Sequence, residues 1–186
     1  AFQKMSRLVR DLSVTQHKKV HLQLLGEDTE IDRNIVEELA DPLMHMIRNA
    51  VDHGIESPDL RTEQGKPAQG TVKLQASHQG GGIVIRISDD GKGMDKKTLE
   101  EVFFSLGSTT KTNQDSVGGF GKARIILCFA QTEYMIRTNQ LFVRGSGADY
   151  EIEEDYKHVK GCEFLITVPV NKFYSNQDAF ENSLKT

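Results

Sequence analysis

The chain has 186 residues, a formal net charge of −4 and a sequence pI near 5.9. This length suits one α/β domain with a sizeable core, and the mild acidity gives no electrostatic footprint for nucleic acid. No apolar run approaches the roughly 20 residues of a bilayer-spanning helix and no signal peptide is visible, so we expect no membrane insertion by this segment. Cys128 and Cys162 lie in or beside apolar segments, without a CxxC pair. They predict reduced thiols in a cytoplasmic protein and argue against a zinc site.

Two elements are expected before residue 30. Apolar residues between Phe2 and Leu12 recur at helical spacing and predict the end of an amphipathic helix. Residues 20–24 alternate between apolar and polar side chains and then meet Gly26, which predicts a strand and its turn. The chain opens at Ala1 without an initiator methionine, so we expect it to be a piece of a longer protein.

A longer helical pattern follows between residues 32 and 51, where apolar residues keep a period of 3.6. Pro42 interrupts this pattern, so either two helices abut there or Pro42 occupies the first turn of the second helix. Asp41 precedes the proline and is a candidate N-cap. Gly54 is expected to end the helix.

The remaining elements are expected from local patterns of turn residues and alternation. Residues 105–121 are polar, carry several glycines and show no clear period, which is typical of a lid or binding loop. The other expected elements are a short helical turn at 57–67, paired strands at 71–76 and 83–87 joined by Gly80–Gly82, helices at 95–104 and 123–130, closing strands at 132–138, 141–144, 150–154 and 163–170, and a weakly patterned tail.

One face of the long helix carries His45, Asn49 and His53. Steps of four residues leave each side chain only about 40° from the last, so the three lie on one helical face. Buried polar groups need partners, and amide and imidazole groups are plausible ligands for a hydrated Mg²⁺ on a nucleotide. Either histidine alone is more often a satisfied structural residue, and it is the combination with the motifs downstream that indicates a site.

A second motif, Asp89-Asp90-Gly91-Lys92-Gly93, follows an apolar strand. An ionised Asp89 accepts hydrogen bonds only, and the exocyclic amine of adenine donates them, so Asp89 could read the base. Gly91 and Gly93 permit left-handed backbone and close approach. Taken alone, the motif is more often an ordinary tight turn after a strand.

A third motif, Gly118-Gly119-Phe120-Gly121-Lys122, precedes a predicted helix. Free N–H groups and the helix dipole could hold a phosphate there, with Lys122 as a point charge. The run is not a Walker A motif, because Ala123 stands where a Ser or Thr would bind Mg²⁺. A flexible loop with a solvated lysine is the competing interpretation.

The three motifs follow one another in the order Asn-bearing helix, DxGxG and GxG. This order resembles the Bergerat ATPase superfamily, which includes the gyrase, heat-shock chaperone, mismatch-repair and histidine kinase ATPases. The likeness is strongest to chemotaxis-type histidine kinases, through the run from Val9 to Glu56 and the strand motif Gly161–Pro169. It covers about residues 2–170. The resemblance implies a two-layer α/β sandwich, with a mixed, largely antiparallel sheet covered by helices.

The resemblance also implies a site for ATP and Mg²⁺. Asn49 would ligate Mg²⁺ with His53 as a possible second ligand, and His45 would act on the phosphoryl group or its water. Asp89 would bind adenine in a pocket that Gly91 and Gly93 shape. The other nucleotide-contacting residues expected by the resemblance are Asp52, Met94, Phe104, Ser108, Thr109, Gly119, Phe120, Gly121, Lys122 and Cys162.

The same resemblance predicts the organisation of the chain. Residues 1–14 would end a dimerisation or linker helix, residues 15–170 would form the ATP-binding catalytic domain, and residues 171–186 would be a tail. The expected function is that of a sensor histidine kinase domain in two-component signalling, which passes the γ-phosphoryl group to a histidine on another domain or chain. A phosphoacceptor histidine domain and a response regulator are the expected partners, and the parent protein is expected to be a homodimer.

Three departures from the family pattern keep alternatives open. The motif around Lys122 looks more like the chaperone-type ATPases, Cys162 replaces a common Thr, and residues 141–160 are longer and more acidic than in the kinases. One alternative is a chaperone- or mismatch-repair-like ATPase whose hydrolysis drives lid closure. The other is a catalytically silent module that binds ATP.

Overall fold

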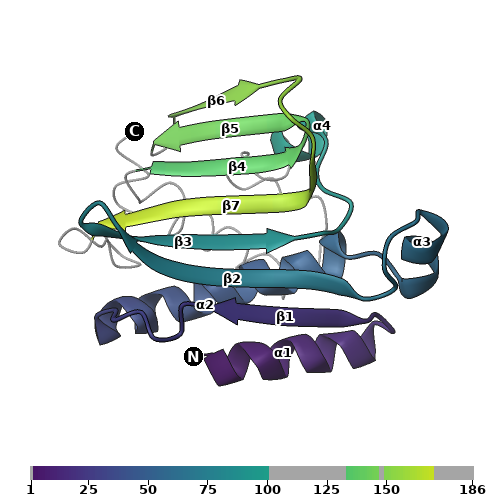
Figure 1. Ribbon diagram of the computed structural model, residues 1–186, viewed down its shortest axis with the longest axis horizontal. Helices are drawn as coiled ribbons and strands as arrows, with labels where there is room; N and C mark the ends of the chain where they lie inside the picture. Colours follow the sequence, from purple (N-terminus) through teal and green to yellow (C-terminus); the bar gives the residue numbers. More distant parts are fainter. Residues whose placement is uncertain (1, 101–132, 147–148, 170–186) are drawn as a thin grey trace, which may run out of the picture.

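The computed structural model describes residues 2–100, 133–146 and 149–169, and these form one sheet with helices packed against it (Figure 1). The expected helix at 123–130, the tail at 171–186 and residues 101–104 of the expected helix at 95–104 lie outside the described residues. The sheet has seven strands in the order β1-β2-β3-β7-β4-β5-β6. Their bounds are Val20–Leu25 (β1), Gly70–Gln79 (β2), Gly82–Asp89 (β3), Glu133–Asn139 (β4), Leu141–Ser146 (β5), Asp149–Glu153 (β6) and Val159–Pro169 (β7).

The sheet is mixed and largely antiparallel, as predicted. Only the pair β1–β2 is parallel among the described strands, and the other neighbouring pairs are antiparallel. The parallel pair needs a long crossover, and this crossover holds most of the helical residues that the structure describes. The hairpin between β2 and β3 turns at Gly80 and Gly81, whose positive φ angles of 59° and 79° explain the glycines there.

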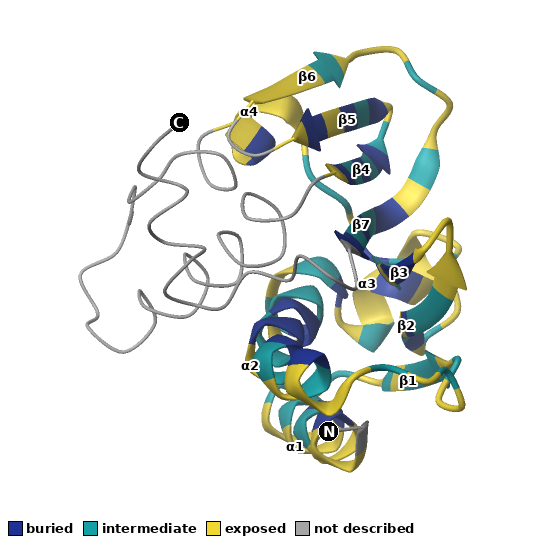
Figure 2. Cartoon of the chain, turned by 90° about the vertical axis from the view of Figure 1, so that its left-hand side faces the viewer, coloured by how far each residue is buried: buried dark blue, intermediate teal, exposed yellow. Residues whose placement is uncertain are grey.

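The helical elements lie before and between these strands. The figures place α2 across one face of the β1–β3 part of the sheet, with α1 beside β1 (Figures 1 and 2). The bounds are Phe2–Thr15 (α1), Arg33–Asn49 (α2), the π-helical turn Ala50–Gly54 (η1), Pro58–Glu63 (α3) and Lys96–Thr98 (α4).

The helix α2 corrects two sequence-based expectations. It begins at Arg33, where the Asp32 side chain accepts a hydrogen bond of 2.8 Å from the N–H of Asn34, so the prediction of an N-cap at Asp41 was wrong. Pro42 lies inside one continuous helix and is buried. A proline removes one backbone hydrogen bond. Here the apolar stripe on both sides of it is buried, and this burial keeps the helix intact.

The core lies between α2 and the sheet. Ile47 and Val51 on the helical side and Val72 and Ile166 on the sheet are fully buried, and Figure 2 shows buried segments on the facing sides of α2 and the strands. Burial of such side chains contributes roughly 1.5–3 kcal/mol each. The helix that carries the candidate ligands is therefore held firmly against the strands.

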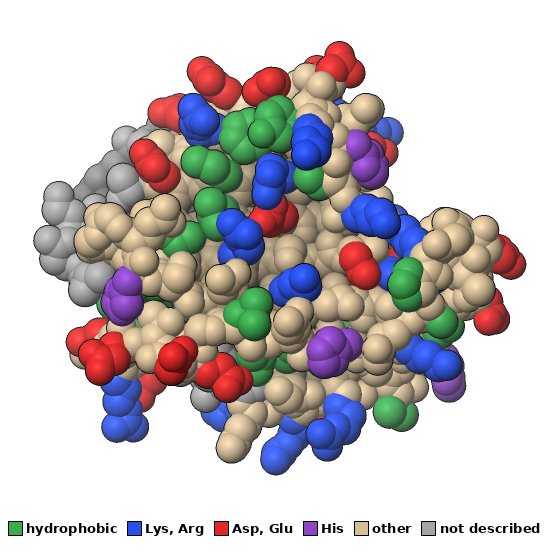
Figure 3. All heavy atoms as spheres, in the orientation of Figure 1, with side chains coloured by type: hydrophobic (Ala, Val, Ile, Leu, Met, Phe, Trp, Pro, Cys, Tyr) green, Lys and Arg blue, Asp and Glu red, His purple; other side chains and the backbone are tan. Residues whose placement is uncertain are grey.

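The opposite face of the sheet carries mixed charges (Figure 3). Glu163 on β7 pairs with Arg86 on β3, at 3.2 Å between Oε1 and Nε, and with Arg137 on β4. Ion pairs whose cation is partly exposed, as here, contribute little to stability. In the described ranges, no helix combines the length and the apolar character needed to cross a bilayer.

Candidate functional site

The candidate site begins where α2 changes into a π-turn. The N–H of Ile55 donates a hydrogen bond of 2.8 Å to the carbonyl of Ala50, five residues back, and η1 ends at Gly54. The α-helical rotation of about 100° per residue, which predicted that His45, Asn49 and His53 share one face, therefore applies only as far as Asn49. His45 and Asn49 are partly buried and His53 is exposed. π-Turns are rare and occur mostly as single turns at functional sites.

The amide of Asn49 is the polar group that needs a partner. Its Nδ2 atom is buried and has no hydrogen-bond partner within the described residues. Amide nitrogen and oxygen are distinguished only by their hydrogen bonds, so a half-turn of the amide puts the carbonyl oxygen at the same place. An oxygen there is a suitable ligand for Mg²⁺. No group of three His, Cys, Asp or Glu side chains in the described part of the chain could hold a metal ion alone.

Asp89, the last residue of β3, lies against the end of η1. Its Oδ1 accepts a hydrogen bond of 2.9 Å from the N–H of Gly91. A Cβ atom at Gly54 would lie 3.3 Å from this oxygen, at Gly91 2.9 Å and at Gly161 2.8 Å. Three glycines from separate segments therefore leave the carboxylate free of side-chain neighbours on those sides. The structure brings together the helix motif and the DxGxG motif.

The environment of Asp89 changes its acidity. Burial raises the pKa of Asp89 to about 6, and the negative charges of Asp90 and Glu56 act in the same direction. Backbone hydrogen bonds from Gly91 and Cys162 oppose this rise. A carboxyl group with a perturbed pKa beside a glycine-lined space is a candidate functional group.

Two residues that the sequence analysis missed hold the end of the DxGxG motif. Thr138 on β4 accepts a hydrogen bond of 2.7 Å from the N–H of Met94, and its hydroxyl donates one of 3.0 Å to the carbonyl of Gly161. Asn139 donates from Nδ2 to the carbonyl of Met94 at 3.0 Å. Gly93 has a φ of 72°, and a Cβ there would lie within 3 Å of both side chains. In the sequence, the only local sign of these two residues is that they are polar and stand at the end of a strand with alternating side chains.

Cys162, the residue that replaces the common Thr, is buried opposite Thr138 in the register of β4 and β7. Burial, with the nearby charge of Asp89, raises the pKa of the Cys162 thiol well above its ordinary value, although Thr138 forms a hydrogen bond with it. The thiol is therefore protonated at neutral pH and acts as a small, weakly polar group beside Asp89.

A buried network of charges supports the loop behind Asp89. Arg61 is fully buried and donates to Oε2 of Glu56 at 2.9 Å and to Oδ2 of Asp90 at 3.1 Å. Lys66 donates to Oε1 of Glu56 at 2.5 Å and to the carbonyl of Gly91 at 3.0 Å. Burial alone would raise the pKa of Glu56, but the hydrogen bond and charge of Lys66 and the charge of Arg61 lower it below its ordinary value. The carboxylate of Glu56 therefore keeps its charge in the interior.

The other predicted residues divide into two groups. Asp52 accepts a hydrogen bond at Oδ1 from Gln16, in the turn after α1, and is partly buried. The expected lid residues lie outside the described part of the chain: Phe104, Ser108, Thr109, Gly119, Phe120, Gly121 and Lys122.

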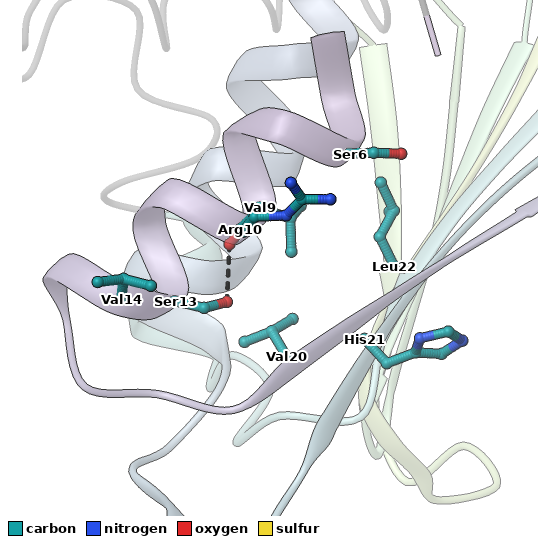
Figure 4. A pocket seen from close by; sticks show the side chains of 8 residues that line it. All are labelled: Ser6, Val9, Arg10, Ser13, Val14, Val20, His21 and Leu22. Atoms are coloured by element: carbon teal, nitrogen blue, oxygen red, sulfur yellow. Dashed lines mark hydrogen bonds between the residues drawn. The ribbon is translucent and has the colours of Figure 1, made fainter. Parts of the chain in front are cut away.

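An open groove of about 310 Å³ between α1 and β1 is separate from these residues (Figure 4). Val9 and Val14 of the helix and Val20 and Leu22 of the strand line it. None of the residues predicted to bind nucleotide contributes to its walls.

With this geometry in place, the comparison with known families is specific. A family model described as histidine kinase-, DNA gyrase B- and HSP90-like ATPase matches residues 38–172, which is well over half of the chain. The chain belongs to this family. The matched range begins before Asn49 and ends after Cys162, so it contains both motifs that meet at Asp89.

Individual relatives are named as a chemotaxis protein and as a sensor histidine kinase. "Chemotaxis protein CheA" of Treponema pallidum is 50% identical over 99 residues, which are 53% of this chain and 12% of the relative. "Sensor histidine kinase CheAY" of Helicobacter pylori is 41% identical over 136 residues, which are 67% of this chain and 17% of the relative. The chain therefore spans less than a fifth of these relatives.

Among solved structures, the histidine kinase domain of the Erythrobacter litoralis EL346 blue-light activated histidine kinase aligns with a TM-score of 0.49 at 13% identity. The alignment covers 91% of this chain and 64% of that chain.

Proposed function

We propose that the chain is the ATP-binding catalytic domain of a chemotaxis-type histidine kinase. It binds Mg-ATP and passes the γ-phosphoryl group to a histidine on another domain or chain. The observation that carries the proposal is the meeting of Asp89, in its glycine-lined space, with the end of the helix that bears Asn49. The similarity to a chemotaxis protein CheA and to a sensor histidine kinase CheAY supports the choice of reaction.

Adenine recognition is assigned to Asp89. Its ionised carboxylate accepts the hydrogen bond that the exocyclic amine of adenine donates, and a guanine carbonyl at the same place would be repelled. Gly91 and Gly93 let the backbone approach the base, while Thr138 and Asn139 fix the position of Met94 at its edge. Selectivity for adenine over guanine follows from this arrangement.

The phosphate end is assigned to α2. Asn49 would hold Mg²⁺ through its amide oxygen, with His53 as a second ligand that is accessible because it is exposed. Bound Mg²⁺ would neutralise charge on the phosphates, which is the main requirement of phosphoryl transfer. His45, one turn before Asn49, would contact the transferred group or its water. The lid over the triphosphate is assigned to the glycine-rich segment that ends at Lys122.

Transfer breaks the bond between the γ-phosphorus and its bridging oxygen, leaves ADP, and forms a phosphorus–nitrogen bond on the acceptor imidazole. The proposed acceptor is a histidine domain whose phosphoryl group passes on to a response regulator. We further propose that α1 continues a dimerisation helix in a homodimeric parent protein. A free, buried Cys162 is typical of a reducing compartment, which supports a cytoplasmic location.

The proposal is tested in two steps with the unaltered chain. Calorimetric titration with a non-hydrolysable ATP analogue, with and without Mg²⁺, should show magnesium-dependent and adenine-selective binding. Incubation with ATP labelled at the γ-phosphate and a separate histidine phosphoacceptor domain should then give an acid-labile, alkali-stable phosphoprotein.

Two other outcomes identify the alternatives. Steady phosphate release without a phosphohistidine product would indicate a chaperone-like ATPase. Saturable nucleotide binding with neither product would indicate a silent binding module. Absence of binding under both conditions would contradict the assignment of the site.

A further inference from the structure

The turn between α1 and β1 makes direct contact with the π-turn η1. Lys18 donates from Nζ to the carbonyl of Val51 at 2.6 Å and to the carbonyl of Asp52 at 2.9 Å. Gln16 donates from Nε2 to Oδ1 of Asp52. Two side chains from a turn more than 30 residues away in the sequence therefore hold two successive carbonyls and a carboxylate of η1.

These contacts satisfy groups that a helix end leaves open. The last carbonyls of a helix have no partners within it, and a lysine is a favourable partner because its charge complements the helix dipole. Lys18 is partly buried, and this burial lowers the pKa of its amine, an effect that the charge of Asp52 opposes. The backbone of the turn adds a constraint, since His17 has a φ of 52°, which a residue other than glycine adopts rarely.

These contacts matter for the candidate site because η1 connects its two parts. At its start η1 follows Asn49, whose amide is buried without a partner in the described structure. At its end the carbonyl of Gly54 accepts a hydrogen bond of 3.0 Å from the N–H of Lys92, in the DxGxG loop. A shift of η1 would therefore move the amide relative to the adenine-binding carboxylate Asp89.

We propose that Lys18 and Gln16 are positioning residues for the nucleotide site, which hold η1 in the place that lets Asn49 meet a magnesium-bound phosphate. This inference rests on the proposed binding of Mg-ATP. Neither side chain touches nucleotide in this scheme. Both act through the carbonyls and the carboxylate of η1, so their removal should weaken the magnesium-dependent part of the affinity and leave adenine binding in place.

The test compares three variants of the chain: Lys18→Met, Lys18→Arg and Lys19→Met. The control residue Lys19 is the exposed neighbour of Lys18. Each variant is titrated calorimetrically with a non-hydrolysable ATP analogue in Mg²⁺ and in EDTA. We expect Lys18→Met to lower the affinity in Mg²⁺ at least fivefold and the affinity in EDTA less than twofold. Lys18→Arg should recover most of the loss, and Lys19→Met should match the unaltered chain.

If Lys18→Met lowers the affinity equally in Mg²⁺ and in EDTA, the role of Lys18 is merely structural and the inference is overturned. An affinity of Lys18→Met equal to that of the unaltered chain would also overturn it. If Lys18→Met fails to fold in a thermal melt, Gln16→Leu takes its place, and the same magnesium-specific loss is required of it. A magnesium-independent affinity of the unaltered chain would overturn the proposed function and this inference with it. If the affinity of the unaltered chain depends on Mg²⁺ and the affinity of the Lys18→Met variant is the same, only the inference about Lys18 and Gln16 is overturned.

Discussion

Gly161 passes so close to Asp89 that a Cβ atom on it would lie 2.0 Å from the carbonyl oxygen of Asp89 and 2.8 Å from Oδ1. Its φ of 69° also lies in the left-handed region that favours glycine. The glycine thus meets two requirements at once: a backbone conformation and a close approach. Strand β7 reaches the candidate adenine-binding carboxylate only because this residue has no side chain.

Gly161→Ala should destabilise the fold by more than 2 kcal/mol, because both the conformation and the contact become unfavourable. The matched control is Gly80→Ala, which has a φ of 59° and open space around the added atom. That change should cost only about 1 kcal/mol for the conformation. Urea unfolding of both variants measures the difference, and equal losses would show that the contact with Asp89 is unimportant.

Asp89→Asn should lower the affinity for ATP more than tenfold, which is about 1.4 kcal/mol or more. The change removes a charged acceptor and can present an N–H₂ group to the amine of adenine. Calorimetry with the ATP analogue measures the effect, with Asp59→Asn on the exposed side of α3 as the control. Binding of GTP as tight as that of ATP by the unaltered chain would refute the assignment.

The pKa of Asp89 predicts two opposite pH dependences. The folded chain binds a proton at this group more tightly than the unfolded chain, whose Asp pKa is about 4. The contribution to stability is therefore full below pH 4, and the free energy of unfolding falls as the pH rises to about 6. Affinity for ATP should instead increase over pH 5 to 7, because only the ionised carboxylate accepts from adenine.

Urea unfolding and calorimetry at half-unit steps of pH measure these two trends, and Asp89→Asn should lose both contributions. An ATP affinity that stays flat across this range would contradict the assigned role of the ionised carboxylate.

Asn49→Ala should remove most of the difference between ATP affinity in Mg²⁺ and in EDTA while leaving the fold intact. No described residue accepts a hydrogen bond from Nδ2 of Asn49, so the loss of this donor leaves no described acceptor unpaired. The same titrations measure the effect, and a thermal melt checks the fold. If the dependence on Mg²⁺ persists in the variant, Asn49 does not hold the metal.

Arg61→Met should cost about 3–5 kcal/mol of stability, because it leaves the buried carboxylate of Glu56 without one of its partners. The comparison is Arg33→Met, which breaks an exposed pair with Glu37 and should change stability by about 0.5 kcal/mol or less. Urea unfolding midpoints measure both. A similar small effect at both positions would mean that Lys66 alone satisfies Glu56.

The strands of this fold were predictable from the sequence because alternation and glycine turns are local signals. The run at 83–87, for example, became the internal strand β3 with its expected partner β2. Pro42 misled the prediction for α2, because a local rule about proline was outweighed by burial on both sides of it. The outcome shows where packing overrides propensity.

The candidate site was only partly accessible to the sequence. Asp89 and its glycines stand in a motif, so they could be selected before the structure. Three other residues act through contacts with partners more than 20 residues away in the sequence, and no local spacing predicts such contacts: Thr138, Asn139 and Arg61. The π-turn was equally invisible, since its residues fit an ordinary α-helix pattern.

That π-turn makes the length of the segment between Asn49 and Gly54 a requirement of its own. A hydrogen bond that reaches back five residues encloses one more residue than the four-residue bond of an α-helix. Deleting any single residue there would restore an ordinary helix and rotate everything beyond it by about 100°. Lys18 would then face different carbonyls, and Gly54 would leave Asp89. The segment should therefore tolerate conservative substitutions better than any change in residue number.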